Sequence, residues 1–600
     1  YFPPGRYRIT ETLTIKEQDG VRLVGHGRDT VLLWDGEEGG TMYWSNGVHR
    51  STYEGLTYDG AGKAGIGSEH RSQSRFETHL TYRCCSFRNL EYGIAVGKNP
   101  SKSASAEIRY ENVVFKNNKT GVLFERYNDY DNWFDGCVFV DNTTGIFSNR
   151  GHFHARNSHF IRNSRVDVRI GFPQPSYSLR WCTSSGSGQF LITDKRKGHQ
   201  GGAVENCVIE GWTNPDGAVD LAWRGPTLIF DTVFKDPPDD QPPIRLTNPE
   251  YMEQVLVLSG NTSPGTSQVV APGVNASITD IPPGEEEPLL TSRVPLFFRP
   301  TVDVTTRIFD AKRDFGAVGD GEADDTEAVR ATIAAARKHG KGALAYLPRG
   351  VYKITSTLRL DGNDYILGGN HFRTTELVWH GDPEGVLMEV HDPTNITVRN
   401  MRLMSVEDAE VSNWWSERKS KGPPKQRNQR NFVTALYSKT EADRIAESRG
   451  TVKILQTGSG AGSESSVHYD DLYLGRGSYD NITGIEFRRL PPKTKVRLGF
   501  ISGFLHFIDS GQAEILGQIH LGKMVVEGAE LPKSGFLGCL FHNDVHRDYA
   551  LTVKDNQNIV VADLYQEQTD RALYLSGGDR AGSGSVTLGL SRFESFRPGF

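Results

Sequence analysis

A group of acidic and amide side chains near the end of the chain could catalyse the cleavage of a glycosidic bond. Glu567 lies in DLYQEQTDR, directly after the apolar segment NIVVADL. The polar residues around it are Asp563, Gln566, Gln568 and Asp570. A carboxylic acid at a strand end can protonate a leaving oxygen while a second carboxylate positions a water. We therefore predict Glu567, Asp563 and Asp570 as catalytic and the two glutamines as substrate-binding. A polar turn is the alternative.

A second group of residues could bind a sugar. Residues 125–133 read ERYNDYDNW and combine three aromatic rings with carboxylates. Rings can stack on pyranose faces while carboxylates bind hydroxyl groups. The predicted substrate-binding residues here are Glu125, Tyr127, Asp129, Tyr130, Asp131 and Trp133. An ordinary long turn is the alternative reading.

A third group alternates strictly between polar and small or apolar residues. It spans residues 150–156, RGHFHAR. In a strand, the alternation places its polar residues on one outer face. These predicted substrate-binding residues are Arg150, His152, His154 and Arg156. The ridge could hold an anionic polysaccharide, with a histidine as base in a β-elimination, or it could be a solvated face paired with nearby acids. Two histidines without a third ligand predict no zinc site, and we expect no cofactor.

The elements that must position these groups occur in two copies. Residues 1–15 read YFPPGRYRITETLTI, and residues 346–360 read YLPRGVYKITSTLRL, with eight identical positions. A motif repeated at a constant offset predicts two copies of one architecture in tandem. Residues 314–345 precede the second copy, whereas nothing precedes the first. We therefore expect that about 30 residues of the first copy are missing from its beginning.

Within the first copy, four segments align on the aromatic residues Phe87, Phe115, Phe139 and Phe160. An apolar strand, a turn with asparagine and another apolar strand recur in each. The turn residues are Asn89, Asn117 or Asn118, Asn142 and Asn163. This irregular repeat predicts an all-β fold of two tandem right-handed parallel β-helices, in which each coil pairs with its neighbours at ~4.8 Å. Each is entered through a short covering helix, truncated in the first copy.

The cysteines follow the same repeat. Cys85, Val113, Cys137, Ser158 and Cys207 stand two residues before the aromatic or apolar anchor of their coil. The pattern predicts an inward-facing column of small residues. Cys85 and Cys137 are two coils apart, roughly 9–10 Å, which is too far for a disulfide. We interpret them as buried thiols with a packing role.

Further signals set the boundaries. Asp324, Asp325 and Thr326 introduce a helical pattern over residues 327–339, terminated by Gly340. Residues 264–300 are rich in Pro, Gly, Ser and acidic residues and predict a linker. We expect a first β-helix at 1–262, a linker at 263–306 and a second β-helix at 307–600. A long polar loop at 412–430 is either functional or a surface excursion.

The bulk composition excludes some classes of partner. The formal net charge is −6, which gives no global reason to bind nucleic acid or an anionic membrane. No apolar run approaches the ~20 residues of a membrane span. We expect a polysaccharide or oligosaccharide as the substrate, and neither nucleic acid nor membrane as a partner.

The segment DFGAVGDGEADDT, a helix and then YLPRGVYKIT resemble the opening motif of the pectate-lyase-3-like parallel β-helix superfamily. Two copies in one chain resemble the tandem arrangement of glycoside hydrolase family 55, the exo-β-1,3-glucanases. The resemblance implies a secreted or periplasmic enzyme that cleaves a polysaccharide, foremost a glycoside hydrolase that inverts configuration. The alternatives are a lyase acting on a uronic-acid polymer and a non-catalytic, tailspike-like glycan-binding β-helix. Fold alone does not decide among them.

Overall fold

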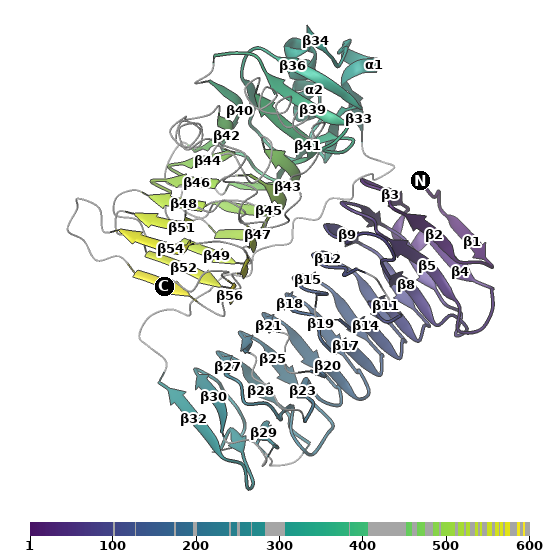
Figure 1. Ribbon diagram of the computed structural model, residues 1–600, viewed down its shortest axis with the longest axis vertical. Coiled ribbons are helices and arrows are strands. Elements are labelled where there is room, and N and C mark those ends of the chain that lie inside the picture. The colour runs from purple at the N-terminus through teal and green to yellow at the C-terminus, as the bar shows by residue number, and fades with distance from the viewer. Residues whose placement is uncertain are drawn as a thin grey trace, which may run out of the picture. The chain divides into compact units, whose positions relative to one another are not determined.

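The structure of the protein is a computed structural model that describes residues 1–594 with gaps. The gaps are 100–102, 127, 173–175, 196–200, 239–241, 249–252, 266, 283–306, 383–384, 406–451, 459–464, 475–483, 491–493, 504, 511–513, 521–523, 528–533, 538–539, 543–548, 555–557, 563–564, 568–570, 577–584 and 589–591. The chain divides into two compact units, Tyr1–Asp303 and Val304–Phe600. Each unit is a parallel β-solenoid, as predicted (Figure 1).

The first unit consists of three parallel sheets, which we call N1, N2 and N3. Sheet N1 contains β2 Leu13–Lys16, β5 Thr41–Asn46, β8 Ile66–His70, β11 Tyr92–Val96, β14 Thr120–Phe124, β17 Thr144–Ser148, β20 Val166–Ile170, β23 Leu191–Thr193, β26 Val219–Leu221, β29 Ile244–Leu246 and β31 Val269–Val270. Sheet N2 contains β3 Arg22–Val24, β6 Thr52–Glu54, β9 Leu80–Arg83, β12 Ile108–Glu111, β15 Asn132–Asp135, β18 Phe153–Arg156, β21 Tyr177–Arg180, β24 Gly202–Glu205, β27 Thr227–Phe230, β30 Gln254–Ser259 and β32 Ala276–Ile281. Sheet N3 contains β1 Gly5–Ile9, β4 Thr30–Trp34, β7 Thr57–Asp59, β10 Ser86–Arg88, β13 Val114–Lys116, β16 Val138–Val140, β19 His159–Ile161, β22 Thr183–Ser185, β25 Val208–Glu210 and β28 Val233–Lys235. Every coil runs from N3 to N1 to N2 and back to N3.

The register of this unit agrees with the sequence repeat. Phe87 pairs with Phe115, Phe115 with Phe139, and Phe139 with Phe160 on consecutive coils. Their rings stack at 5.6, 4.8 and 4.9 Å between centroids. All four rings are fully buried. The aromatic residues therefore form a continuous stack inside the solenoid, which fixes the alignment of neighbouring coils.

An asparagine ladder closes the turn between sheets N3 and N1. Asn118 Nδ2 donates to Asn142 Oδ1 at 3.1 Å, and Asn142 Nδ2 donates to Asn163 Oδ1 at 3.0 Å. Each amide also donates to a phenylalanine carbonyl of the preceding coil. Asn89 and Asn117 are not rungs of this ladder, since they hold the left-handed backbone of their turns at φ 57° and 56°. Of the two candidates at the second turn, Asn118 is therefore the inward one.

The cysteine column also faces the interior. Cys85, Cys137 and Cys207 are at most 1% exposed, and each thiol lies within hydrogen-bonding distance of backbone carbonyls. Cys182, which the sequence analysis did not include, occupies the same position. Burial raises the pKa of Cys85 to about 12, so the thiol is protonated and packs as a small apolar group.

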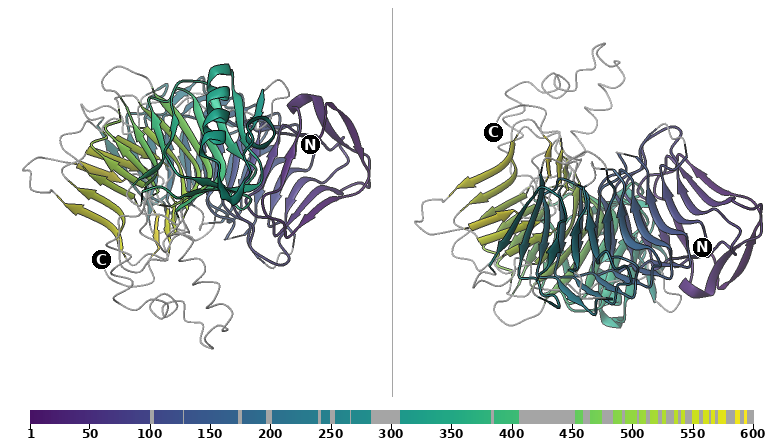
Figure 2. Two further views of the ribbon diagram at one scale, coloured as in Figure 1. Left: turned by 90° about the horizontal axis from the view of Figure 1, so that it is seen from above. Right: turned by 90° about the horizontal axis from the view of Figure 1, so that it is seen from below.

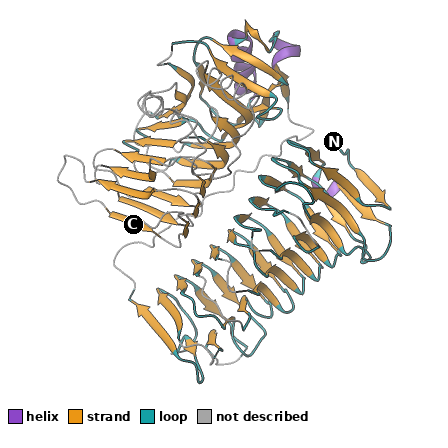
Figure 3. Cartoon of the chain, in the orientation of Figure 1, coloured by secondary structure: helices purple, strands orange, loops and turns teal. Residues whose placement is uncertain are grey.

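The second unit begins with its two helices, α1 Ala311–Phe315 and α2 Thr326–His339. Helix α2 buries Val329, Ile333 and Ala336 and begins and ends where the sequence predicted. Figure 3 shows both helices at the start of this unit, whereas strands make up most of the rest of the chain. Strands β31 and β32 lie within the segment that we expected to be linker. The first solenoid therefore extends past residue 262.

The second unit contains an eight-stranded sheet, C1, and two further sheets, C2 and C3. Figure 2 shows the ribbon of the chain from above and from below. Sheet C1 contains β37 Leu358–Leu360, β40 Val386–His391, β42 Val452–Thr457, β44 Ile485–Arg488, β46 Leu505–Ile508, β48 Met524–Glu527, β51 Tyr549–Lys554 and β54 Arg571–Ser576. Sheet C2 contains β33 Ile308–Asp310, β34 Asp320–Asp324, β35 Ala343–Leu347, β36 Gly350–Ile354, β38 Tyr365–Gly369, β39 Thr375–Trp379, β41 Ile396–Ser405, β43 Ser466–Leu474, β45 Lys495–Ser502, β47 Glu514–His520, β49 Ser534–Leu537, β52 Asn558–Ala562 and β55 Ser585–Leu588. Sheet C3 contains β50 Leu540–His542, β53 Tyr565–Glu567 and β56 Arg592–Glu594. By the sequence repeat, β37 corresponds to β2, so C1 is the counterpart of N1.

Candidate active site

The predicted catalytic group at the end of the chain lies on sheet C3. Glu567 is the last residue of β53 and pairs with His542 on one side and Glu594 on the other. Gln566 precedes it on the same strand. Asp563, Gln568 and Asp570 lie outside the described residues. The catalytic role of Glu567 therefore stays a prediction.

The carboxylates of the predicted sugar-binding loop organise the loop itself. Asp129 is fully buried, and its carboxylate accepts backbone N–H bonds from Arg126 at 2.9 Å and Ser105 at 3.4 Å. Burial raises the pKa of Asp129 to about 7. Asp131 accepts a 2.9 Å hydrogen bond from the indole of Trp133. These carboxylates accept hydrogen bonds from buried donors of the chain. A sugar hydroxyl could bind a carboxylate only by displacing one of these donors.

The loop and the alternating ridge meet on the outer face of sheet N2. Trp133 on β15 stacks on His154 on β18, with 4.3 Å between ring centroids. Arg156 lies over the same indole at 5.2 Å and donates to Asp135 at 3.1 Å. Trp133, His154 and Arg156 are 4%, 8% and 7% exposed. Because the Trp133 side chain is almost fully buried, a sugar has no open ring face there.

The remaining predicted residues are dispersed around this corner. Glu125 accepts a 2.8 Å bond from Asn149, and the ring of Tyr130 lies 6.1 Å from that of buried His152. Arg150 is exposed and lies beyond the end of β17, away from the N2 face. Tyr127 lies outside the described residues. The four polar residues of the ridge therefore do not share one open face, although their roles stay predictions.

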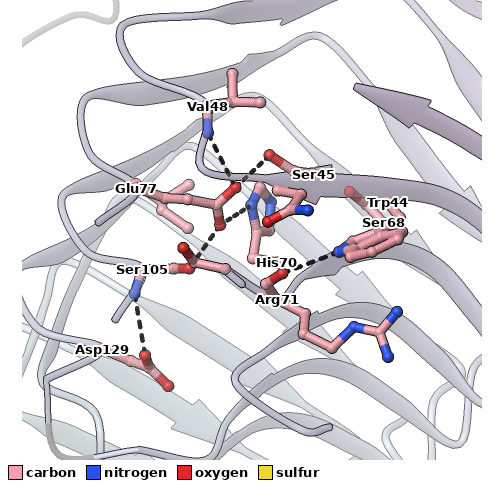
Figure 4. Close-up of polar contacts among 12 residues, drawn as sticks. Trp44, Ser45, Val48, Ser68, His70, Arg71, Glu77, Ser105 and Asp129 are labelled. Atoms are coloured by element: carbon pink, nitrogen blue, oxygen red, sulfur yellow. Dashed lines mark hydrogen bonds and ion pairs between the residues drawn. The ribbon is translucent and has the colours of Figure 1, made fainter. Parts of the chain in front are cut away.

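A second polar group lies inside the first unit, where no substrate can reach it (Figure 4). Glu77 and His70 are fully buried, with 3.4 Å between the carboxylate and the ring nitrogen. Glu77 also accepts hydrogen bonds from Ser45 at 2.7 Å and Ser105 at 2.6 Å. Burial by itself would raise the pKa of Glu77, but the bonds and charge of His70 and the two hydroxyls more than offset this and lower it. This group joins three consecutive coils from within and is structural.

Sheet C1 carries a group of catalytic residue types that the sequence analysis missed. His506 on β46, Glu527 on β48 and Lys554 on β51 lie on three consecutive strands. The alternation of these strands directs Leu505, Phe507, Met524 and Val526 into the core and leaves His506 and Glu527 on the outer face. The ring nitrogen Nε2 of His506 lies 2.8 Å from Glu527 Oε1, and Lys554 Nζ lies 3.4 Å from Oε2. One carboxylate thus holds a histidine and a lysine together on an outer face.

This group is open enough to meet a ligand. The side chains of His506, Glu527 and Lys554 are 19%, 27% and 44% exposed. Burial alone would raise the pKa of Glu527, but the charges and hydrogen bonds of His506 and Lys554 lower it instead. Glu527 is therefore ionised at neutral pH and can fix the tautomer of His506 by accepting its Nε2–H.

A further cation lies on the preceding strand. Arg488 on β44 is exposed and forms an ion pair with Glu486 of the same strand. In the sheet, Glu486 pairs with His506, and Arg488 pairs with Ile508. The outer face of C1 therefore presents a histidine and two cations, each cation beside a carboxylate. The alternation IEFR in β44 was the sequence signal for this face. The order in which these coils stack could not be predicted from the sequence, because residues 450–560 show no constant repeat length.

Among the residues that the structure describes, no metal centre is found. None of them forms a group of three or more histidine, cysteine, aspartate or glutamate side chains placed to hold an ion. Within the same residues, no helix is long and apolar enough to cross a membrane.

The chain resembles known proteins in short segments. Residues 309–417 match the profile of the family described as rhamnogalacturonase A/epimerase, pectate lyase-like. Alginate lyase 7 of Azotobacter vinelandii is 44% identical over 63 residues, which are 9% of this chain and 7% of that protein. Mannuronan C5-epimerase AlgE5 of the same organism is 32% identical over 119 residues, 17% of this chain and 12% of the epimerase. The matches thus span only a small part of these relatives.

A solved structure, an alginate lyase from Paenibacillus sp. str. FPU-7, aligns with 47% of this chain and 93% of its own. The identity is 12% and the TM-score 0.27. A structural match with a TM-score this low supports no inference about the function of this chain. The pectate-lyase-like character rests on the family profile and on the parallel solenoids themselves.

These findings correct the expected reaction. The expectation of a glycoside hydrolase is wrong, because the curated relatives are an alginate lyase and mannuronan C5-epimerases. The resemblance to glycoside hydrolase family 55 is not shown either. The opening motif that suggested it builds the covering helix and first coils, and hence specifies a framework that different chemistries share. The findings thus show two parallel β-solenoids, with a pectate-lyase-like family match over residues 309–417.

Proposed function

We propose that this β-helix protein acts on a uronic-acid polysaccharide by removing the proton at C5 of a uronate, as a lyase or an epimerase. The observation that carries the proposal is its similarity to an alginate lyase and to mannuronan C5-epimerases. Their names denote elimination and C5 inversion, and both reactions begin by breaking the same C–H bond. An extracellular location agrees with a polymeric substrate.

The outer face of sheet C1 supplies the groups that this step needs. A uronate carboxylate must be neutralised, because the negative charge that develops when C5 loses its proton spreads onto it. Lys554, beside Glu527, and Arg488, beside Glu486, lie on the same face as His506 and can provide this neutralisation. A base must then accept the proton, and an imidazole has a pKa suited to that task at neutral pH.

Glu527 positions this base. Its ionised carboxylate accepts the Nε2–H of His506, so that Nδ1 carries the lone pair that takes the C5 proton. In a lyase, the electron pair then forms the C4–C5 double bond and the glycosidic oxygen at C4 leaves with a proton. In an epimerase, a proton returns to C5 from the opposite face. The two outcomes share the first step and differ in the second.

One pair of measurements tests the proposal. The protein is incubated with alginate, polymannuronate and polygalacturonate in D₂O. Ultraviolet absorbance reports the unsaturated product of a lyase, and NMR reports deuterium incorporated at C5 by an epimerase. If neither signal develops on any polyuronate, the proposal is rejected. Reducing ends without ultraviolet absorbance would indicate hydrolysis and would contradict it as well.

A further inference from the structure

A column of cationic side chains runs along the corner where sheet N1 turns toward sheet N2. The last residues of five neighbouring N1 strands pair in register: Val96 with Phe124, Phe124 with Ser148, Ser148 with Ile170, and Ile170 with Thr193. Two residues beyond these strand ends stand, in order, Lys98, Arg126, Arg150, Phe172 and Lys195. Four of five consecutive coils thus place a cation at one position.

The backbone keeps this column regular. The residue just beyond each strand still pairs with the preceding coil: Glu125 N donates to Val96 O at 3.1 Å, Asn149 N to Phe124 O at 2.8 Å and Asp194 N to Ile170 O at 2.8 Å. The coils therefore remain stacked at about 4.8 Å up to the cation column. An extended polymer with one charge per sugar meets about one cation per coil.

The cations are accessible, and two carboxylates lie near them: Asp129 interacts with Arg126, and Asp220 interacts with Lys195. Lys98, Arg150 and Lys195 are exposed, and Arg126 is half-buried. Asp194 forms a two-point ion pair with Arg169, and Glu125 accepts from Asn149. Among the described residues, no carboxylate forms an ion pair with Arg150. The column therefore carries an excess of positive charge on a chain whose net charge is −6.

Aromatic rings accompany the cations. The guanidinium of Arg150 lies 4.7 Å from the ring centroid of Phe172, and Arg169 lies 4.5 Å from that of Phe147. Lys98 lies 5.0 Å from the ring of Tyr92. All three rings are half-buried. Cations that pair with carboxylates, with apolar ring surface beside them, suit an acidic polysaccharide. The bases of a nucleic acid would need open ring faces, and these rings are covered by cations.

We propose that this column is a second binding site, in the first unit, for the uronic-acid polymer that sheet C1 is proposed to transform. The inference rests on the proposed function for the nature of the substrate. It assigns to the column no catalytic step. Its role is to hold a long chain by charge pairing, one uronate per coil.

The test compares two double variants in the full chain, in a His506→Ala background that does not consume the ligand. Arg150→Ala with Lys195→Ala removes two cations from the column. Lys116→Ala with Arg162→Ala removes two exposed cations on or just beyond N3 strands of neighbouring coils. Binding of polymannuronate is measured by calorimetry, with a neutral β-glucan and double-stranded DNA as comparison ligands. Circular dichroism confirms that both variants fold.

We expect the column variant to raise the Kd for polymannuronate by about tenfold, since each lost contact is a charge-assisted hydrogen bond. The N3 variant should stay within about twofold of its parent, because it removes only exposed surface charges. Equal Kd values for both variants would overturn the inference, as would equally tight binding of DNA or of the neutral glucan. Absence of polymannuronate binding by the parent would overturn it too.

The outcomes separate this site from the proposed reaction. Turnover of polyuronate by the wild type, with no effect of the column variant on binding, rejects the column and retains the reaction. Binding through the column by a wild type that yields neither product rejects the reaction and retains the column.

Discussion

At the scale of single residues, the outer face of C1 combines the hydrogen-bonded group His506, Glu527 and Lys554 with a second cation, Arg488, which pairs with Glu486. Each of these types has a common structural use on its own. Their coincidence on adjacent strands is what favours chemistry, because a base needs both an orienting partner and nearby positive charge to remove a weakly acidic proton.

Replacement of His506 by alanine should lower kcat by about 10²–10⁴-fold, the usual contribution of a general base. The fold should persist, because the side chain is on the solvent side of β46. Initial rates on polymannuronate measure the effect. His391→Ala, which removes another half-exposed histidine from the same sheet, is the matched control. Equal loss of activity in both variants would show that the effect is structural.

At the scale of elements, the buried group around Glu77 joins strands β5 and β8 to the segment that carries Ser105. Two hydroxyls and a histidine depend on one carboxylate. Removing that carboxylate would leave the imidazole and both hydroxyls without their acceptor inside the solenoid.

Glu77→Ala should lower the free energy of unfolding by about 3–5 kcal/mol, the cost of breaking a buried charge pair. Because the pKa of Glu77 is lowered in the folded state, its stabilisation is present above the unfolded pKa and is lost as the pH falls through the folded one. Urea unfolding at pH 3 and pH 7 measures this. The difference between wild type and variant should shrink at pH 3, and a constant difference would contradict the assignment.

The contribution of Asp129 to stability should depend on pH in the opposite direction to that of Glu77. Burial raises its pKa to about 7, so the folded protein retains a proton that the unfolded chain releases near its ordinary value of 3.8. The stability that this proton contributes is complete below pH 3.8 and is lost as the pH rises through about 7. Asp129→Asn cannot ionise, so its unfolding free energy relative to wild type should increase from pH 5 to pH 8. A difference independent of pH would show that Asp129 is ionised in the fold.

At the scale of the whole molecule, the distribution of charge matters more for binding a polyanion than the net charge does. A net charge of −6 repels a polyanion at long range, while the cation column attracts it locally. Both effects weaken over about 10 Å at 0.1 M salt. Binding therefore depends on close pairing between uronates and cations.

Affinity for polymannuronate should accordingly fall steadily as sodium chloride rises from 0.05 to 0.5 M, since salt screens exposed ion pairs. Calorimetric titrations across this range measure the slope. The column variant should show a shallower slope than the variant on sheet N3, because it has fewer pairs to screen. Identical slopes would indicate that the column does not contact the polymer.

The sequence determined the tandem solenoids, the aromatic stack and the inward cysteines, because a parallel coil repeats its apolar pattern in the chain itself. It also specified helix α2 through its capping residues and terminal glycine. It could not distinguish hydrolase from lyase, since the shared motif encodes only the framework. Only the tertiary structure decided which polar side chains meet. His506 and Lys554 are 48 residues apart and join through Glu527 once the coils stack in register. Conversely, the sequence predicted an outer polar face for the ridge at 150–156. In the structure, His154 and Arg156 are buried against Trp133 and Asp135 of the preceding coil, and His152 is buried beside Tyr130.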